Sequence, residues 1–148
     1  MRENLAEKAV SFFKEGFICS ESVLMTMQDY LGLEINPKIA TGFGGGIGRK
    51  GSVCGAVTGS ILAINLKYGR KRLEDNDIKE KAFSKALEFY NKFEEKMESA
   101  ICYDIIKCDL KTEEGQKTFK DNNLLEEKCF KCVEISVGIL LEIFESEE

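Results

Sequence analysis

The 148-residue chain contains no histidine, no tryptophan and a single proline, Pro37. Without histidine, general acid–base catalysis by imidazole is excluded, and any metal site has to rely on thiolates with help from carboxylates. Long hydrophobic runs are also missing, because the uncharged run from Ser52 to Leu66 spans 15 residues, fewer than the ~20 that a membrane-spanning helix needs. The net charge of −5 argues against affinity for nucleic acid, which requires a basic face. We therefore expect neither a membrane nor a nucleic-acid partner.

The composition is that of a soluble globular protein, with 43% hydrophobic and 32% charged residues. A chain of this length is expected to form one domain over residues 1–148 with a sizeable core. Its first residues, MRENLAEKAVSFF, are charged and amphipathic and do not resemble a signal peptide. These features favour a cytoplasmic location.

Nearly every segment has the apolar spacing of a helix, and none shows the alternation of a strand. The sequence predicts an all-α fold: a single-domain bundle of about five to six helices around a central uncharged helix preceded by a Gly-rich loop. The central helix is expected to begin near Cys54, with Gly51 or Ser52 as N-cap, and to end at Gly69. The segment 112–123 is polar and is expected to be weakly structured. The other expected helices cover residues 4–15, 20–31, 76–98 and 124–144, with short helices after Pro37 and around Cys102.

The stretch from Gly42 to Gly59 holds eight of the thirteen glycines. Glycine at this density is expected where the backbone takes a positive φ or approaches another group closely. Nucleotide binding is not indicated, because there is no GxxxxGK[ST] motif and no strand precedes the loop. Gly55 and Gly59 are one helical turn apart and indicate close helix packing. The remaining loop residues are the candidates to close over a bound cofactor, together with two adjacent cations: Gly44, Gly45, Gly46, Arg49 and Lys50.

Six cysteines are the unusual feature of the composition. In a reducing compartment this number indicates metal binding or thiol chemistry rather than structural disulfides. Four of them are expected at or near helix N-termini, where free N–H groups stabilise a thiolate: Cys19, Cys54, Cys102 and Cys129. Because Cys54 also has Arg49 and Lys50 nearby, we expect its pKa to lie below the ~8.5 of a free cysteine.

The last two cysteines in the chain, Cys129 and Cys132, are one helical turn apart, so both sulfurs face the same side. This spacing serves a metal and a dithiol equally well. The alternative is a pair of buried cysteines on an apolar stripe, because free cysteine is among the most buried residues. Cys132 is the more core-like of the two, and Cys108 is interpreted as structural or incidental.

Four stretches together form a recognisable pattern: ICSESV around Cys19, GFGGGIGRKGSVCGAVTG around Cys54, ICYDIIKCDL around Cys102 and EEKCFKCV around Cys129. The pattern resembles the C_GCAxxG_C_C family of redox-active proteins and covers nearly the whole chain. It departs from the family name, which spells Gly-Cys-Ala where this chain has Cys54-Gly55-Ala56. The resemblance implies cysteine-based redox chemistry or a bound metal centre, and it implies no particular substrate.

Two functions remain open. The first is a cytoplasmic oxidoreductase or electron-transfer protein whose catalytic Cys19, Cys54, Cys102 and Cys129 meet at one site. That site would carry out thiol–disulfide chemistry or hold zinc or an iron–sulfur cluster, with Cys132 as a further candidate ligand. A partner protein that the sequence does not identify would exchange electrons with it. The second is a non-enzymatic helical binding or assembly module with structural cysteines or a structural zinc. Both are compatible with a homo-oligomer.

Overall fold

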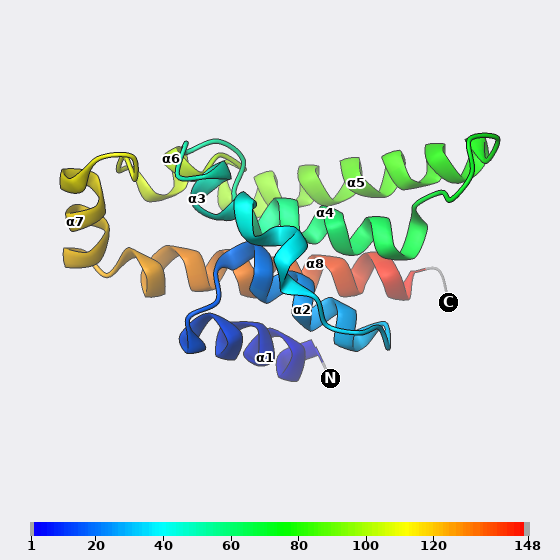
Figure 1. Cartoon of the computed structure of the whole chain (residues 1–148), viewed down its shortest axis with the longest axis horizontal. Helices are drawn as coiled ribbons and strands as arrows, with labels where there is room; N and C mark the ends of the chain where they lie inside the picture. The colour runs from blue at the N-terminus through cyan, green and yellow to red at the C-terminus, as the bar shows by residue number, and fades with distance from the viewer. Residues whose placement is uncertain (1, 147–148) are drawn as a thin grey trace.

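The computed structural model describes residues 2–146 and is built from helices (Figure 1). Within these residues the only β-type pairing is an isolated antiparallel bridge between Val53 and Ile101. The all-α prediction is confirmed, with more short helices in the described part than the five or six expected. The α-helices are α1 (Arg2–Glu15), α2 (Cys19–Tyr30), α3 (Gly44–Ile47), α4 (Gly55–Tyr68), α5 (Asn76–Met97), α6 (Cys102–Ile106), α7 (Glu113–Asp121) and α8 (Phe130–Glu145). A 3-10 helix (Pro37–Phe43) precedes α3, and a π-helical turn (Leu125–Cys129) leads into α8.

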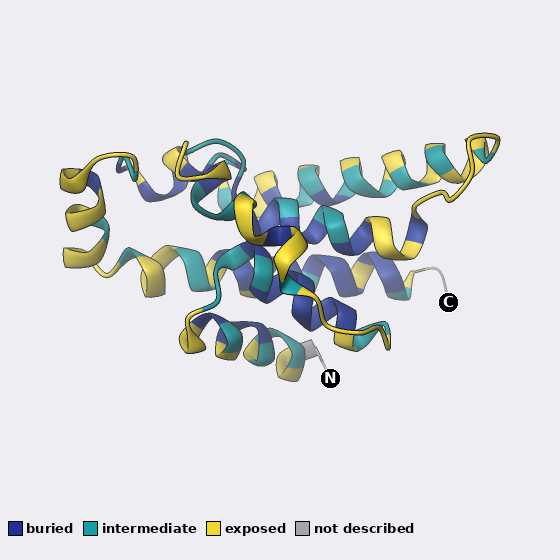
Figure 2. Ribbon diagram, viewed as in Figure 1, coloured by how far each residue is buried: buried dark blue, intermediate teal, exposed yellow. Residues whose placement is uncertain are grey.

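Helix α4, whose one charged residue is Lys67 in its last turn, lies at the centre in contact with α2, α5 and α8, as expected for a helix that is apolar on most of its faces. The buried residues concentrate on α2, α4 and α8 (Figure 2), whereas α5 contributes Phe89 and Phe93. Helix α1 packs against α8 and α2. Among the described residues, no helix is both long enough and apolar enough to cross a membrane.

The helix pair α2 and α4 packs unusually closely, because α4 presents glycine where it meets the start of α2. A Cβ added at Gly59 would lie 2.5 Å from the carbonyl oxygen of Ser20 and 2.9 Å from its Cα. These contacts confirm that Gly59 belongs to a face where helices pack closely.

The prediction for residues 112–123 was wrong, because α7 occupies most of this segment. The hydroxyl of Thr112 accepts a hydrogen bond from the N–H of Gly115 at 2.9 Å, which caps the first turn. Glu113 in the first turn and Lys120 in the last turn complement the helix dipole. Short-range capping and charge therefore form a helix in a segment with little apolar periodicity. α7 lies at the end of the molecule opposite the connection between α4 and α5 (Figure 1).

Candidate functional site

A cavity of about 430 Å³ is lined by residues from α1, the start of α2, the glycine loop, the start of α4, α6, α7 and the beginning of α8. Five of the six cysteines line it: Cys19, Cys54, Cys102, Cys129 and Cys132. The sixth, Cys108, is buried but does not line the cavity. All six are free thiols. The structure thus brings together the four cysteines that the sequence predicts at one site and Cys132, the further candidate ligand, while their chemical roles remain predictions.

Cys54 is the N-cap residue of α4, so the helix begins two to three residues later than expected from Gly51 or Ser52 as N-cap. The preceding residues are extended, because they pair with the segment before α6. The N–H of Cys54 donates to the carbonyl of Ala100 at 2.7 Å, and the N–H of Cys102 donates to the carbonyl of Ser52 at 2.7 Å. This short antiparallel pairing holds the starts of α4 and α6 side by side and delivers both cysteines to the cavity.

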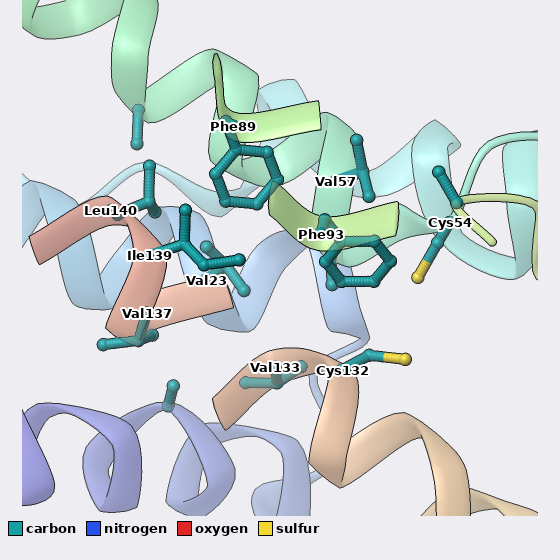
Figure 3. Close-up of a cluster of buried hydrophobic side chains, with 14 of the residues drawn as sticks. Val23, Cys54, Val57, Phe89, Phe93, Cys132, Val133, Val137, Ile139 and Leu140 are labelled. Atoms are coloured by element: carbon teal, nitrogen blue, oxygen red, sulfur yellow. The ribbon is translucent and has the colours of Figure 1, made fainter. Parts of the chain in front are cut away.

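The expected lowering of the Cys54 pKa is contradicted by its surroundings. The neighbouring Cys132 side chain, followed by burial, raises the pKa of the Cys54 thiol well above its ordinary value. Backbone N–H groups of Ala56 and Val57 act in the opposite direction, as a helix N-terminus should, but do not outweigh these effects. Figure 3 shows the sulfurs of Cys54 and Cys132 directed into the same space.

Cys19 is the first residue of α2, and its sulfur lies directly against the backbone of Gly55 at the start of α4. A Cβ at Gly55 would overlap the Cys19 sulfur, so the absence of a side chain there allows this sulfur to lie beside Cys54. Burial, followed by the proximity of Cys54, raises the pKa of Cys19 to about 12. The N–H groups of Ser20 and Gly45 point at the sulfur and partly oppose this effect.

Cys102 begins α6, and Cys129 lies at the end of the π-helical turn. Burial is the main reason that the pKa of Cys102 rises to about 12, followed by its proximity to Cys54 and Cys19. Burial also raises the pKa of Cys129 strongly, with Cys19 next in importance. Cys132, one turn further along α8, is only 1% exposed. The cavity thus holds several thiols that stay protonated at neutral pH and that each oppose the ionisation of their neighbours.

The candidate cofactor-binding residues of the glycine loop separate into two groups. Gly44, Gly45 and Arg49 line the cavity, whereas Gly46 and Lys50 do not. Gly46 has a φ of +68° and packs behind the cavity wall, where a Cβ would lie 2.7 Å from the Cβ of Cys102. Lys50 is exposed to solvent. Only part of the predicted loop therefore contributes to the cavity.

Cys132 was expected to be more core-like than Cys129, and its 1% exposure confirms this, although it also lines the cavity. One contribution to the cavity was missed in the sequence. Phe119 lines the cavity from α7, the helix that had not been predicted. Its signal was the capping threonine, Thr112, seven residues earlier.

The thiols supply the donor chemistry that zinc, copper(I) and iron–sulfur clusters prefer. However, no group of three or more Cys, Asp or Glu side chains within residues 2–146 is arranged so that it could hold a metal ion.

Comparison with known proteins agrees with this cysteine-centred architecture. A protein of Archaeoglobus fulgidus, described as "Uncharacterized protein", is 29% identical over 112 residues, which cover 70% of this chain and 74% of the relative. No solved structure matches the chain. The family model described as "Putative redox-active protein (C_GCAxxG_C_C)" matches residues 17–143. Because this match covers most of the chain, including all six cysteines, the protein belongs to the C_GCAxxG_C_C family.

Proposed function

We propose that the protein is a cytoplasmic thiol–disulfide oxidoreductase in which Cys54 and Cys132 cycle between dithiol and disulfide. The observation that supports this most directly is that the sulfurs of Cys54 and Cys132 are directed into the same space at the wall of the cavity (Figure 3). Both thiols are buried, at 7% and 1% exposure, so their disulfide would be shielded from reducing proteins in bulk solution. Disulfides of this kind in a reducing compartment are catalytic or regulatory rather than structural.

The reaction requires an external oxidant, and a small disulfide R–S–S–R is the class we propose. One cysteine loses its proton, attacks a sulfur of R–S–S–R and releases R–SH, which leaves a mixed disulfide. The second cysteine then attacks the mixed disulfide and releases the second R–SH. Two electrons and two protons leave the pair, and the S–S bond of the oxidant is reduced to two thiols.

Either thiol of the pair can make the first attack on the oxidant, and the other thiol then resolves the mixed disulfide. Cys19, Cys102 and Cys129 surround the pair and disfavour a second thiolate in the cavity. Their proposed role is to limit the site to one ionised sulfur at a time.

A redox titration tests this function. Protein purified without oxygen is equilibrated with mixtures of reduced and oxidised glutathione, and disulfides are located by mass spectrometry after trapping of free thiols. We expect a Cys54–Cys132 disulfide in the parent protein, its loss in Cys54→Ser and Cys132→Ser, and its retention in the matched control Cys108→Ser. Cys54→Ser and Cys132→Ser should each accumulate a mixed disulfide with glutathione on the cysteine of the pair that remains.

The same preparation tests the two competing functions. If the parent protein retains iron or zinc in stoichiometric amounts and Cys54→Ser loses it, the site is a metal centre and not a redox-active dithiol. Absence of both metal and disulfide at every glutathione ratio would favour the structural module. That alternative is supported by four cysteines within the hydrophobic core, namely Cys54, Cys102, Cys108 and Cys132. The structural module predicts that serine substitutions of these cysteines lower the stability of the protein and have no other effect.

A further inference from the structure

The cavity is much larger than a pair of sulfurs requires. Its volume of about 430 Å³ is within the range of roughly 300–1,000 Å³ in which proteins bind small organic molecules. Beyond the cysteines, most of its wall is apolar and comes from elements on all sides of the cavity. The apolar side chains are Phe13, Ile18, Ile105, Ile106, Leu110, Phe119 and Leu125. Such a wall favours a ligand with an apolar body.

Arg49 is the one charged residue among the described residues that line the cavity. Its aliphatic stem lies against Gly45, where a Cβ would be 3.1 Å from the Cγ of Arg49 and 3.7 Å from the Cδ1 of Leu110. None of the carboxylates in residues 2–146 forms an ion pair with it. The hydroxyl of Thr41, also in the wall, already donates to the carboxylate of Glu21 at 2.6 Å. The guanidinium is therefore available to an anion at the edge of an apolar cavity.

The glycine loop holds Arg49 there at a conformational cost. Arg49 has a φ of +69° and Ile47 a φ of +67°, a region that is unfavourable for residues with a side chain and most of all for β-branched ones. Backbone hydrogen bonds across the loop maintain this conformation, including those from the N–H of Gly48 to the carbonyl of Gly42 at 3.0 Å and from the N–H of Ser52 to the carbonyl of Gly46 at 2.9 Å. Strain of this kind is concentrated at binding and active sites.

We propose that the cavity binds a small organic anion, with its apolar body against the cysteine-lined wall and its carboxylate or sulfonate paired with Arg49. Burial of the apolar body provides affinity, and the guanidinium provides the preference for an anion through a charge-assisted hydrogen bond. The proposal rests on the proposed function in one respect: if the bound molecule is the oxidant, the substrate class becomes a small anionic organic disulfide. Its S–S bond then accepts the two electrons as described above.

Two fluorescent probes of nearly the same shape test the anion preference. 1-Anilinonaphthalene-8-sulfonate carries a negative charge, and N-phenyl-1-naphthylamine lacks it. We expect Arg49→Ala to weaken binding of the anionic probe by about tenfold or more, since hydrogen bonds to charged groups are worth this much, and to change binding of the neutral probe by less than about twofold. Arg49→Lys should keep most of the affinity for the anion. Lys50→Ala, the adjacent exposed cation outside the cavity, should leave both affinities unchanged.

A second pair of variants locates the probes. Leu110→Trp narrows the cavity and should weaken the binding of both probes. Phe83→Ser removes an apolar side chain that is 64% exposed and outside this cavity, and it should change the binding of neither probe. The proposal is overturned if the anionic probe binds Arg49→Ala as tightly as the parent protein. It is also overturned if neither probe binds, or if Phe83→Ser abolishes binding that Leu110→Trp preserves.

The binding measurements are made in the Cys54→Ser background, which cannot form the Cys54–Cys132 disulfide. A failed glutathione titration therefore leaves the binding result unaffected. Loss of probe binding in turn leaves the redox titration unaffected, so the two proposals fail separately.

Discussion

Replacement of Gly59 by alanine should destabilise the protein, although alanine is the better helix former. The added Cβ would lie 2.5 Å from the carbonyl oxygen of Ser20 and 2.9 Å from its Cα. These are backbone atoms, which yield only if α2 shifts against α4, so we take the upper end of the ~1–3 kcal/mol cost of overpacking. The gain in helix propensity is about 1 kcal/mol. The free energy of unfolding should therefore fall by roughly 2 kcal/mol.

Gly138 provides the matched control, because it is also inside a helix but a Cβ there would meet nothing within 4 Å. Gly138→Ala should raise the free energy of unfolding by up to about 1 kcal/mol. The difference between the two variants, about 3 kcal/mol, isolates the steric cost because the helix-propensity gain cancels. It corresponds to melting temperatures separated by roughly 6–12 °C for a chain of this size. Urea or thermal unfolding that gives the two variants the same stability would refute the close packing of α2 and α4.

Two further predictions concern the capping of α7 and the response to alkaline pH. Thr112→Ala should lower the free energy of unfolding by about 1 kcal/mol, because the Gly115 N–H loses its acceptor, while the exposed control Thr118→Ala should not destabilise; equal urea midpoints would contradict this. Burial raises the pKa of Cys19 and Cys102 from 9.0 to about 12, so the unfolded chain releases these protons first and stability should fall as the pH rises above 9. The slope is up to about 1.4 kcal/mol per pH unit for each thiol. The pKa shifts would be refuted if the free energy of unfolding, measured with urea, stayed constant from pH 8 to 10. They would also be refuted if its dependence on pH were the same in Cys19→Ser as in the parent protein.

Much of the fold follows from local patterns in the sequence. The Asn36-Pro37 pair marks the start of the 3-10 helix, because caps and breakers act within a few residues. Gly69 and the charged connection after it mark the end of α4 and the start of α5. Helix α4 begins later than predicted because of a contact that is distant in the sequence. The residues just before Cys54 are extended because they pair with residues 100–103, about fifty positions away. No pattern of side chains in the sequence indicates a backbone pairing of this kind.

The sequence predicted which cysteines lie at the candidate site, but it did not predict the pKa of Cys54. Helix N-termini and the glycine loop pointed to Cys19, Cys54, Cys102 and Cys129, and these residues line one cavity. The pKa of Cys54 depends instead on burial and on Cys132, which is 78 positions away in the sequence. A sequence shows which thiols lie at a helix N-terminus, where the pKa is lowered. Whether the pKa is in fact lowered depends also on burial and on neighbouring groups that are distant in the sequence.

The means by which the cysteines are positioned bear on whether they are structural or reactive. Cys54 and Cys102 are held by hydrogen bonds of their backbone N–H groups to Ala100 and Ser52. The space for the Cys19 sulfur is created by the missing side chain of Gly55. In each case the position depends on the backbone or on a neighbouring glycine rather than on a bond made by sulfur. A purely structural cysteine needs no such arrangement, because a small apolar residue would fill the same core position. The backbone geometry thus supports our proposal that these sulfurs are placed for chemistry.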